Sequence, residues 1–142
     1  MASFLVPIDG SEHATRAVDY VIKRAGASRE PIEVHLLTVQ VPLTGVNVKL
    51  LVSRDSIEDY YREEGTRILE PSLERLRAAG IAVTPHIGVG DAATVILDYA
   101  KDLLAEEVII GSHGRGAVAG ALMGSVAQKV IHGAAVPVVI IK

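Results

Sequence analysis

The sequence contains no cysteine, and aromatic side chains make up only 4% of its residues. The absence of cysteine excludes disulfide bridges, thiolate catalysis and cysteine-based metal sites, and it agrees with a reducing compartment. The apolar residues are mainly Val, Ile, Leu and Ala. This composition suits strands that are buried on both faces and covered by helices. With 142 residues, the chain is expected to form one domain that spans residues 1–142.

The chain also lacks basic clusters and long apolar runs. Its net charge is −3 and no run of Lys or Arg occurs, so we expect no nucleic-acid partner, because a phosphate backbone is bound by clustered positive charge. No apolar stretch approaches the roughly 20 residues that span a bilayer. The first residues show neither the basic segment nor the cleavage pattern of a secretory signal. We therefore expect no membrane association and a cytoplasmic location.

Short apolar runs alternate with patterns of helical spacing along the chain. The runs predict strands at 4–8, 32–39, 82–89, 108–110 and 136–141. Between them, the helical patterns run from the cap at Ser11 to residue 25, over 56–79, from the cap at Asp91 to residue 103, and over 125–132. This alternation predicts an α/β fold: a doubly wound, five-stranded parallel sheet with helices on both faces, Rossmann-like in architecture.

Proline and glycine mark three interruptions of these patterns. Pro71 lies inside the predicted helix 56–79 and is expected to kink or divide it, because proline removes an internal hydrogen bond. Gly80 is expected to end that helix in a left-handed conformation. Residues 40–54 contain Pro42 and Gly45 and are predicted to form a long loop.

A glycine-rich segment, residues 111–116, follows the fourth predicted strand. Ligands of doubly wound sheets bind beyond the carboxyl ends of the strands, and glycines let backbone N–H groups approach a ligand closely. Nine residues separate Gly114 from Gly124, which precedes Ser125. A helix that begins at Ser125 would direct free N–H groups toward the same space, and its hydroxyl and the charge of Arg115 would add to them. Together these features suit a polyphosphate.

The same residues also have purely structural interpretations. Gly111 can serve as a tight strand exit, Gly124 as a close helix-packing point, and Asp9 as a helix-entry cap. His113 either contacts a terminal phosphate or points to solvent. The segment is not a Walker A loop, because no lysine follows its glycines, and it is not a dinucleotide fingerprint, because it follows the fourth strand rather than the first.

The motif and its flanking strands resemble the universal stress protein family along nearly the whole chain. The matching stretches are residues 6–11, 108–116, 124–130 and 137–141. The spacing Gly-x2-Gly-x9-Gly-Ser is intact and is typical of the ATP-binding branch of that family. The resemblance implies a homodimer that binds ATP. Our leading hypothesis is that ATP, accompanied by Mg²⁺, stabilises one conformation or assembly that an unidentified protein partner recognises.

The resemblance also implies a role for each position. Asp9 would hydrogen-bond the ribose, Pro7 would line the adenosine end, and Val39 would meet adenine through its backbone. Ile110 would lie against the nucleoside, and Val126 would donate its backbone N–H to the phosphates. The complete set of expected binding residues is Pro7, Asp9, Val39, Ile110, Gly111, His113, Gly114, Arg115, Gly116, Gly124, Ser125 and Val126.

No nucleophile–base pair is evident in the sequence, so we predict a binding module with at most slow, Mg²⁺-dependent ATP hydrolysis rather than a dedicated enzyme. An adenylate-forming enzyme or pyrophosphatase of similar architecture would be expected to carry a Ser-Gly-Gly-x-Asp-Ser loop or a His-x-Gly-His motif, and residues 8–12 match neither. A third alternative is a chaperone-like dimer with a vestigial site, against which the intact glycines argue. The remaining histidines show no ligand spacing, so no protein metal site is expected; they are His13, His35, His86 and His132.

The last predicted strand, 136–141, is almost wholly β-branched. Pro137 fits an edge strand, which can spare one N–H group. An apolar edge is an association hazard unless it is paired, and a two-fold axis lets the same strand of a second copy pair with it. We therefore predict a homodimer through this strand; the alternative is a monomer whose edge is short enough to tolerate water.

Overall fold

The computed structural model describes residues 1–43, 53–115 and 122–142. In these ranges the strands are β1 (Ala2–Pro7), β2 (Ile32–Gln40), β3 (Ala82–Val89), β4 (Glu107–Gly111) and β5 (Val138–Ile141). The helices are α1 (Glu12–Ala27), α3 (Arg54–Ala78), α4 (Ala92–Asp102) and α5 (Ser125–Gly133). No helix in the described ranges is long and apolar enough to cross a membrane.

The strands form one parallel sheet in the order β3-β2-β1-β4-β5. The chain winds outward from β1 to β3 and then returns to build β4 and β5 on the other side, so the winding direction reverses between β1 and β4. This reversal is where doubly wound sheets bind ligands. The predicted fold class is confirmed.

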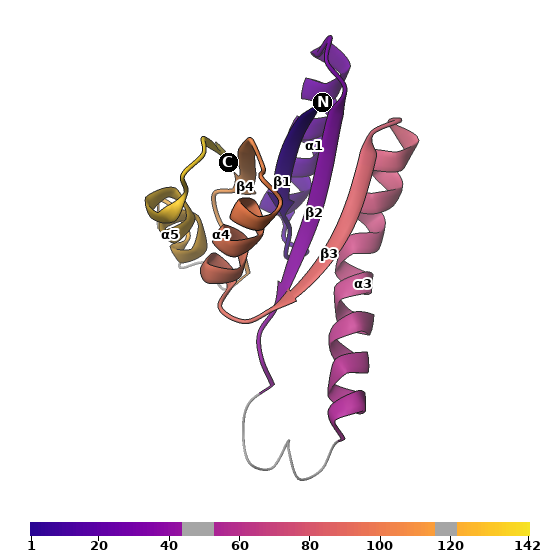
Figure 1. Cartoon of the computed structure of the whole chain (residues 1–142), viewed down its shortest axis with the longest axis vertical. Coiled ribbons are helices and arrows are strands. Elements are labelled where there is room, and N and C mark those ends of the chain that lie inside the picture. Colours follow the sequence, from indigo (N-terminus) through magenta and orange to yellow (C-terminus); the bar gives the residue numbers. More distant parts are fainter. Residues whose placement is uncertain (44–52, 116–121) are drawn as a thin grey trace.

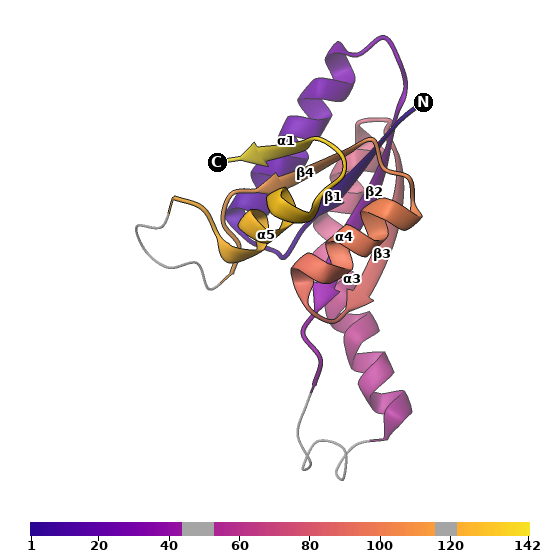
Figure 2. The same ribbon diagram turned by 60° about the vertical axis from the view of Figure 1, so that its left-hand side comes forward.

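Two hydrophobic cores sandwich the sheet because successive strand residues point to opposite faces. Phe4 and Val6 of β1 pack on the side of α1 and α3, whereas Leu5 packs on the side of α4 and α5. Figures 1 and 2 show α4 and α5 next to each other on their side of the sheet. Burial on both faces explains why the strands are continuous apolar runs in the sequence.

The helix starts agree with the predicted caps. The hydroxyl of Ser11 accepts a hydrogen bond from the N–H of Ala14 at 3.3 Å, and the carboxylate of Asp91 accepts one from Thr94 at 3.1 Å. Gly80 has φ +76°, the left-handed conformation expected after α3. These local signals position the starts of α1 and α4 at the carboxyl end of the sheet.

Several predicted bounds differ from the observed ones: β1 begins at Ala2 instead of residue 4, and α3 begins at Arg54 instead of residue 56. The fifth strand begins at Val138 rather than at residue 136, although the side chain of Val136 still packs against the core. Pro71 does not divide its helix, because α3 runs through it. Leu69 and Leu73, on either side of Pro71, are both buried against the core, so packing holds the helix together despite the missing hydrogen bond. The predicted loop overlaps residues 44–52, which lie outside the described residues.

Candidate functional site

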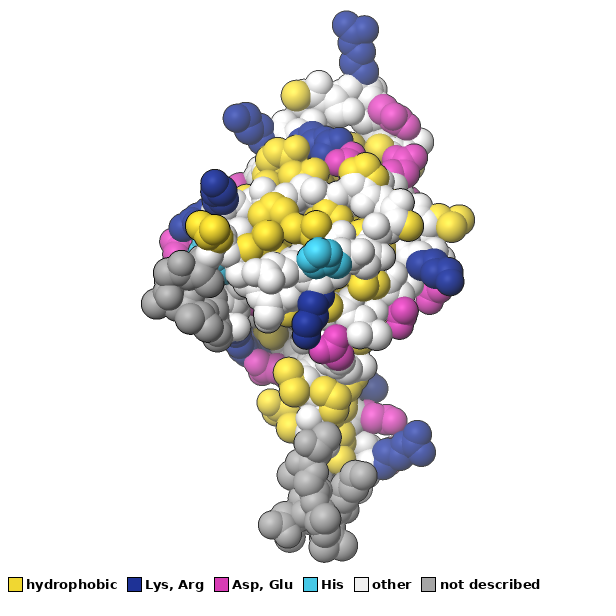
Figure 3. Space-filling model, turned by 90° about the vertical axis from the view of Figure 1, so that its left-hand side faces the viewer, with side chains coloured by type: hydrophobic (Ala, Val, Ile, Leu, Met, Phe, Trp, Pro, Cys, Tyr) yellow, Lys and Arg dark blue, Asp and Glu magenta, His cyan; other side chains and the backbone are white. Residues whose placement is uncertain are grey.

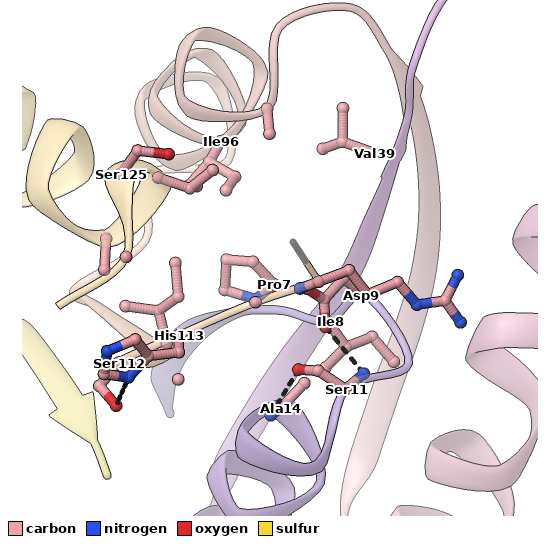
Figure 4. Close-up of a pocket in the computed structure, with 18 of the residues that line it drawn as sticks. Pro7, Ile8, Asp9, Ser11, Ala14, Val39, Ile96, Ser112, His113 and Ser125 are labelled. Carbon is pink, nitrogen blue, oxygen red and sulfur yellow. Dashed lines mark hydrogen bonds between the residues drawn. The ribbon is translucent and has the colours of Figure 1, made fainter. Parts of the chain in front are cut away.

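A pocket of about 330 Å³ opens beyond the carboxyl ends of β1, β2 and β4 (Figure 4). This volume lies within the range of small-molecule sites. Every residue that the sequence predicts for binding lines the pocket except Gly116, which lies outside the described residues. The reversal of winding between β1 and β4 therefore brings together two segments that are far apart in the sequence.

The pocket is lined by both apolar and polar residues. Val39 of β2 and Ile96 of α4 lie on one side, and Ser112 and His113 lie across the pocket from them (Figure 4). Ile110, only 7% exposed, contributes apolar surface at the end of β4. Such a mixed lining suits a ligand that has both an apolar part and a charged part.

The start of α5 adds polar groups to the pocket, and Figure 4 shows Ser125 beside Ile96. Gly124 is the N-cap of this helix and has no side chain with which to cap it. Its own N–H donates to the carbonyl of Ser112 at 2.6 Å, which fixes the helix start against the β4 loop. Ser125 and Val126 both line the pocket in the first turn. First-turn N–H groups have no partner within a helix, so this end of α5 favours an anion.

The carboxylate of Asp9 joins the two loops of the site. One oxygen accepts a hydrogen bond from the N–H of Ser11 and the other from the N–H of Arg115, both at 2.9 Å. The cap of α1 is Ser11 rather than Asp9. Asp9 therefore anchors the glycine-rich loop to the end of β1, a contact that the sequence did not reveal.

Two of the loop glycines are required by close packing. A Cβ at Gly114 would collide with Oδ2 of Asp9. A Cβ at Gly111 would lie 2.9 Å from the backbone carbonyl carbon of His13 in α1. Packing alone thus accounts for these two glycines, and any contact with a ligand would be additional.

Arg115 extends along the rim of the site. Its guanidinium occupies the space beside Gly10, where a Cβ would lie 2.7 Å from Nη2. The pKa of Glu64 in α3 is lowered, mainly by a hydrogen bond from Arg67, with a smaller electrostatic contribution from Arg115. The guanidinium therefore adds positive charge between α3 and the pocket mouth.

Two pairs of histidines meet in space although their spacing in the sequence did not predict it. The rings of His13 and His113 are 5.2 Å apart, and His113 Nδ1 lies 2.9 Å from the hydroxyl oxygen of Ser112. His35 Nδ1 and His86 Nε2 are 2.9 Å apart. Within the described part of the chain, no group of three or more His, Asp or Glu side chains is arranged to hold a metal ion.

Several lining residues were missed by the sequence interpretation. They are Ile8, Ser11, Ala14, Leu37, Ala92, Ile96, Ser112, Met123, Ala127 and Gln128. Ala92 and Ile96 had a usable signal, because the Asp91 cap places the first turns of α4 at the carboxyl end of β3. Met123 and Gln128 had none, since their position depends on how α5 docks.

Comparison with known proteins identifies relatives of the whole chain. The model of the universal stress protein family matches residues 1–142. Universal stress protein YxiE of Bacillus subtilis is 27% identical, and the match covers 97% of each chain. The solved structure of the hypothetical protein MJ0577 has a TM-score of 0.83 at 29% identity, covering 99% of this chain and 94% of that one. A universal stress protein solved in complex with cAMP has a TM-score of 0.72 at 26% identity, covering 99% and 97%.

Proposed function

The chain belongs to the universal stress protein family, and we propose that it is an ATP-binding member that acts as a cytoplasmic, nucleotide-responsive regulatory module. The membership confirms the resemblance drawn from the sequence. One observation carries the proposal: the predicted binding residues that the structure describes all line one pocket at the reversal of the sheet. A relative of 26% identity was solved with cAMP, an adenine nucleotide, which supports this class of ligand.

The pocket offers a place for each part of ATP. Adenine would lie between Val39 and Ile110, the ribose would approach Asp9, and the phosphates would meet the first turn of α5. Asp9 is the one carboxylate among the described lining residues, and both its oxygens already accept backbone hydrogen bonds. Mg²⁺ would therefore be held mainly by the phosphates and would neutralise part of their charge.

The described lining residues favour binding over catalysis. The hydroxyl of Ser112 lies within hydrogen-bond distance of the ring of His113, but Ser112 is only 3% exposed. A nucleophile must reach the reacting atom of its substrate, so a buried hydroxyl is poorly placed. Slow hydrolysis of ATP by water remains compatible with this site; a dedicated adenylate-forming enzyme or pyrophosphatase is the alternative.

The active assembly that we propose is a homodimer. β5 lies at one end of the strand order, and all four of its residues are partly exposed. Hydrophobic side chains gather on the face that carries α5 and the C-terminus (Figure 3). Ile131 of α5 is 41% exposed. Pairing of β5 with a second copy would cover this edge. Binding of nucleotide would then bias a dimer conformation that a partner protein recognises.

The test of the ligand is direct. Protein purified without added nucleotide is denatured, and the released nucleotides are identified by chromatography. Calorimetric titrations with Mg-ATP, AMP and cAMP then rank the affinities. We expect ATP to bind and to be the tightest of the three, because only ATP carries the additional phosphates that would meet the first turn of α5. Binding of none of them at millimolar concentration would overturn the proposal.

A further inference from the structure

His35 and His86 stand outside the pocket and form a direct contact between β2 and β3. His35 Nδ1 and His86 Nε2 are 2.9 Å apart, a hydrogen-bond distance. The register places His35 opposite Thr84 and Leu37 opposite His86, so the two rings meet diagonally on one face of the sheet. β3 is an edge strand, and this contact adds to the backbone ladder that holds it to β2.

The hydrogen bond between His35 and His86 can form only while the two rings carry at most one added proton between them. In the neutral pair one ring donates its N–H and the other accepts it. With one added proton, His35 can donate from Nδ1 to His86 while its Nε2 faces Glu33, whose carboxylate oxygen is 3.7 Å away. With two added protons both facing nitrogens carry hydrogen, so two donors and two positive charges would confront each other at 2.9 Å. The second proton therefore breaks the contact.

Other titratable groups around the pair do not remove this conflict. Glu33 approaches from β2 and interacts with His35 rather than with His86. Tyr99 approaches from α4, with its ring 5.4 Å from that of His86 in an edge-on arrangement. β1 offers the apolar Leu5 opposite His35, and α3 covers the other face of the sheet. His86 thus has no carboxylate against it among the described contacts.

The pair connects to the pocket through α4. Tyr99 lies against His86 and also near Gly88, where a Cβ would be 3.5 Å from its ring. Val95, one turn earlier, lies closer to Gly88, where the same Cβ would be 2.6 Å from its Cγ1. Ile96 of the same helix lines the pocket. A shift of β3 would therefore move α4 and, with it, the side chain of Ile96 in the pocket.

We propose that His35 and His86 form a proton-controlled latch, which holds β3 and α4 in place while the pair carries at most one added proton and loosens them in acid. Its effect on nucleotide affinity rests on the proposed function, whereas its effect on the fold does not. The histidine pair would weaken nucleotide binding when the pH falls below the usual pKa of a histidine side chain.

The sign of the pH dependence follows from the two states. Burial lowers the pKa of His86, and the neighbouring His35 lowers it further. In the unfolded chain both rings take up protons near pH 6.5. Between about pH 6.5 and the lower pKa of His86 in the folded protein, the unfolded chain binds more protons than the folded protein. The free energy of unfolding therefore falls as the pH falls through this range. Below the pKa of His86 in the folded protein, this loss of stability levels off.

The first experiment follows the imidazole signals by NMR during a pH titration of the full chain with EDTA present. We expect the ring of His86 to take up its proton only well below about pH 6.5. Simultaneous protonation of both rings near that pH would overturn the latch. This measurement needs no variant and does not depend on nucleotide.

The second experiment compares stability in urea at about pH 7.5 and about pH 5.5. His86→Gln keeps an amide that can hydrogen-bond His35 but cannot be protonated, and His132→Gln removes an exposed histidine of α5 as the matched control. We expect the unmodified protein and His132→Gln to lose stability in acid by the same amount, and His86→Gln to lose clearly less. Should His86→Gln fold poorly, His35→Gln replaces it. Equal losses in all proteins would overturn the proposal.

The third experiment measures ATP affinity at the same two pH values. The phosphates of ATP also gain a proton in this range, so only the difference between proteins is informative. We expect the acid-induced loss of affinity to be roughly fivefold or more greater in the unmodified protein than in His86→Gln. Absence of ATP binding at about pH 7.5 would refute the proposed function and leave the first two tests of the latch intact. Equal losses would refute the link to the pocket.

Discussion

The carboxylate of Asp9 accepts a hydrogen bond from the backbone N–H of Arg115 at 2.9 Å, although 106 positions separate the two residues in the sequence. This contact ties the glycine-rich loop after β4 to the turn after β1. It crosses the reversal of winding in the sheet, where the pocket opens. The shape of the site therefore depends on one carboxylate that is also placed to meet a ligand.

Replacing Asp9 by Asn tests this dual role. An amide has one acceptor oxygen and one NH₂ group that only donates, so one of the two N–H groups that Asp9 now satisfies would face an N–H of the side chain. We expect ATP affinity to fall on the order of tenfold, equivalent to about 1.4 kcal/mol. Calorimetry measures the effect. Asp102→Asn, an equal charge change on the exposed end of α4, serves as the control and should bind normally. Unchanged affinity in Asp9→Asn would contradict the role of this carboxylate.

Two glycine-to-alanine changes add the same methyl group at a crowded position and at an open one. Gly114→Ala would direct its Cβ at Oδ2 of Asp9 and displace the contact with Arg115. We expect weaker ATP binding, again on the order of tenfold. Gly26→Ala adds the same methyl group in α1, where nothing lies within 4 Å. Because alanine favours helix, it should raise the free energy of unfolding by roughly 0.5–1 kcal/mol and leave binding unchanged. Equal behaviour of the two variants would show that the Gly114 contact is unimportant.

The sequence predicted the parts of this protein that depend on local pattern. Buried parallel strands are continuous apolar runs, and the caps Ser11 and Asp91 mark helix starts, so elements and fold class followed directly. The contacts between elements did not follow. The meeting of His35 with His86 depends on the register of β2 and β3, which no short segment encodes. The same holds for the Asp9–Arg115 contact.

Ser125 gives the sharpest test of the phosphate end. Ser125 is the first residue of α5 and lines the pocket, so its hydroxyl would be placed to donate a hydrogen bond to a phosphate. Ser125→Ala should remove one charge-assisted hydrogen bond of roughly 1.5–3 kcal/mol, which lowers ATP affinity about tenfold to a hundredfold. Ser125→Thr keeps the hydroxyl and should retain more affinity than the alanine variant. Equal calorimetric affinities for the alanine variant and the unmodified protein would exclude a contact of this hydroxyl with the ligand.

Turnover distinguishes a binding module from an enzyme. The described lining residues contain no accessible nucleophile with a base beside it, so hydrolysis of Mg-ATP should be far slower than the roughly 10 s⁻¹ typical of enzymes. A steady-state assay of released phosphate measures this rate. A rate near the typical value that a single loop substitution abolishes would favour the enzymatic alternative.

The proposed dimer makes a prediction about backbone groups at the edge of β5. The carbonyls of Pro137 and Ile141 accept hydrogen bonds from Val108 and Ser112 at 3.0 and 2.7 Å. Because backbone groups alternate in direction along a strand, the N–H of Ile140 points away from β4 and toward the free edge. Antiparallel pairing with a second β5 would use this N–H.

Replacing Ile140 by Pro removes that N–H without touching the ladder to β4. Proline is tolerated on an edge strand when its missing N–H faces outward, so the monomer should still fold. We expect the unmodified protein to sediment as a dimer at micromolar concentration and Ile140→Pro to sediment as a monomer. Ile140→Ala loses most of the side chain but keeps the N–H, and it should remain largely dimeric. If the unmodified protein is a monomer both with and without ATP, the assembly through β5 is wrong, and a dimer that survives in Ile140→Pro would place the interface on another surface.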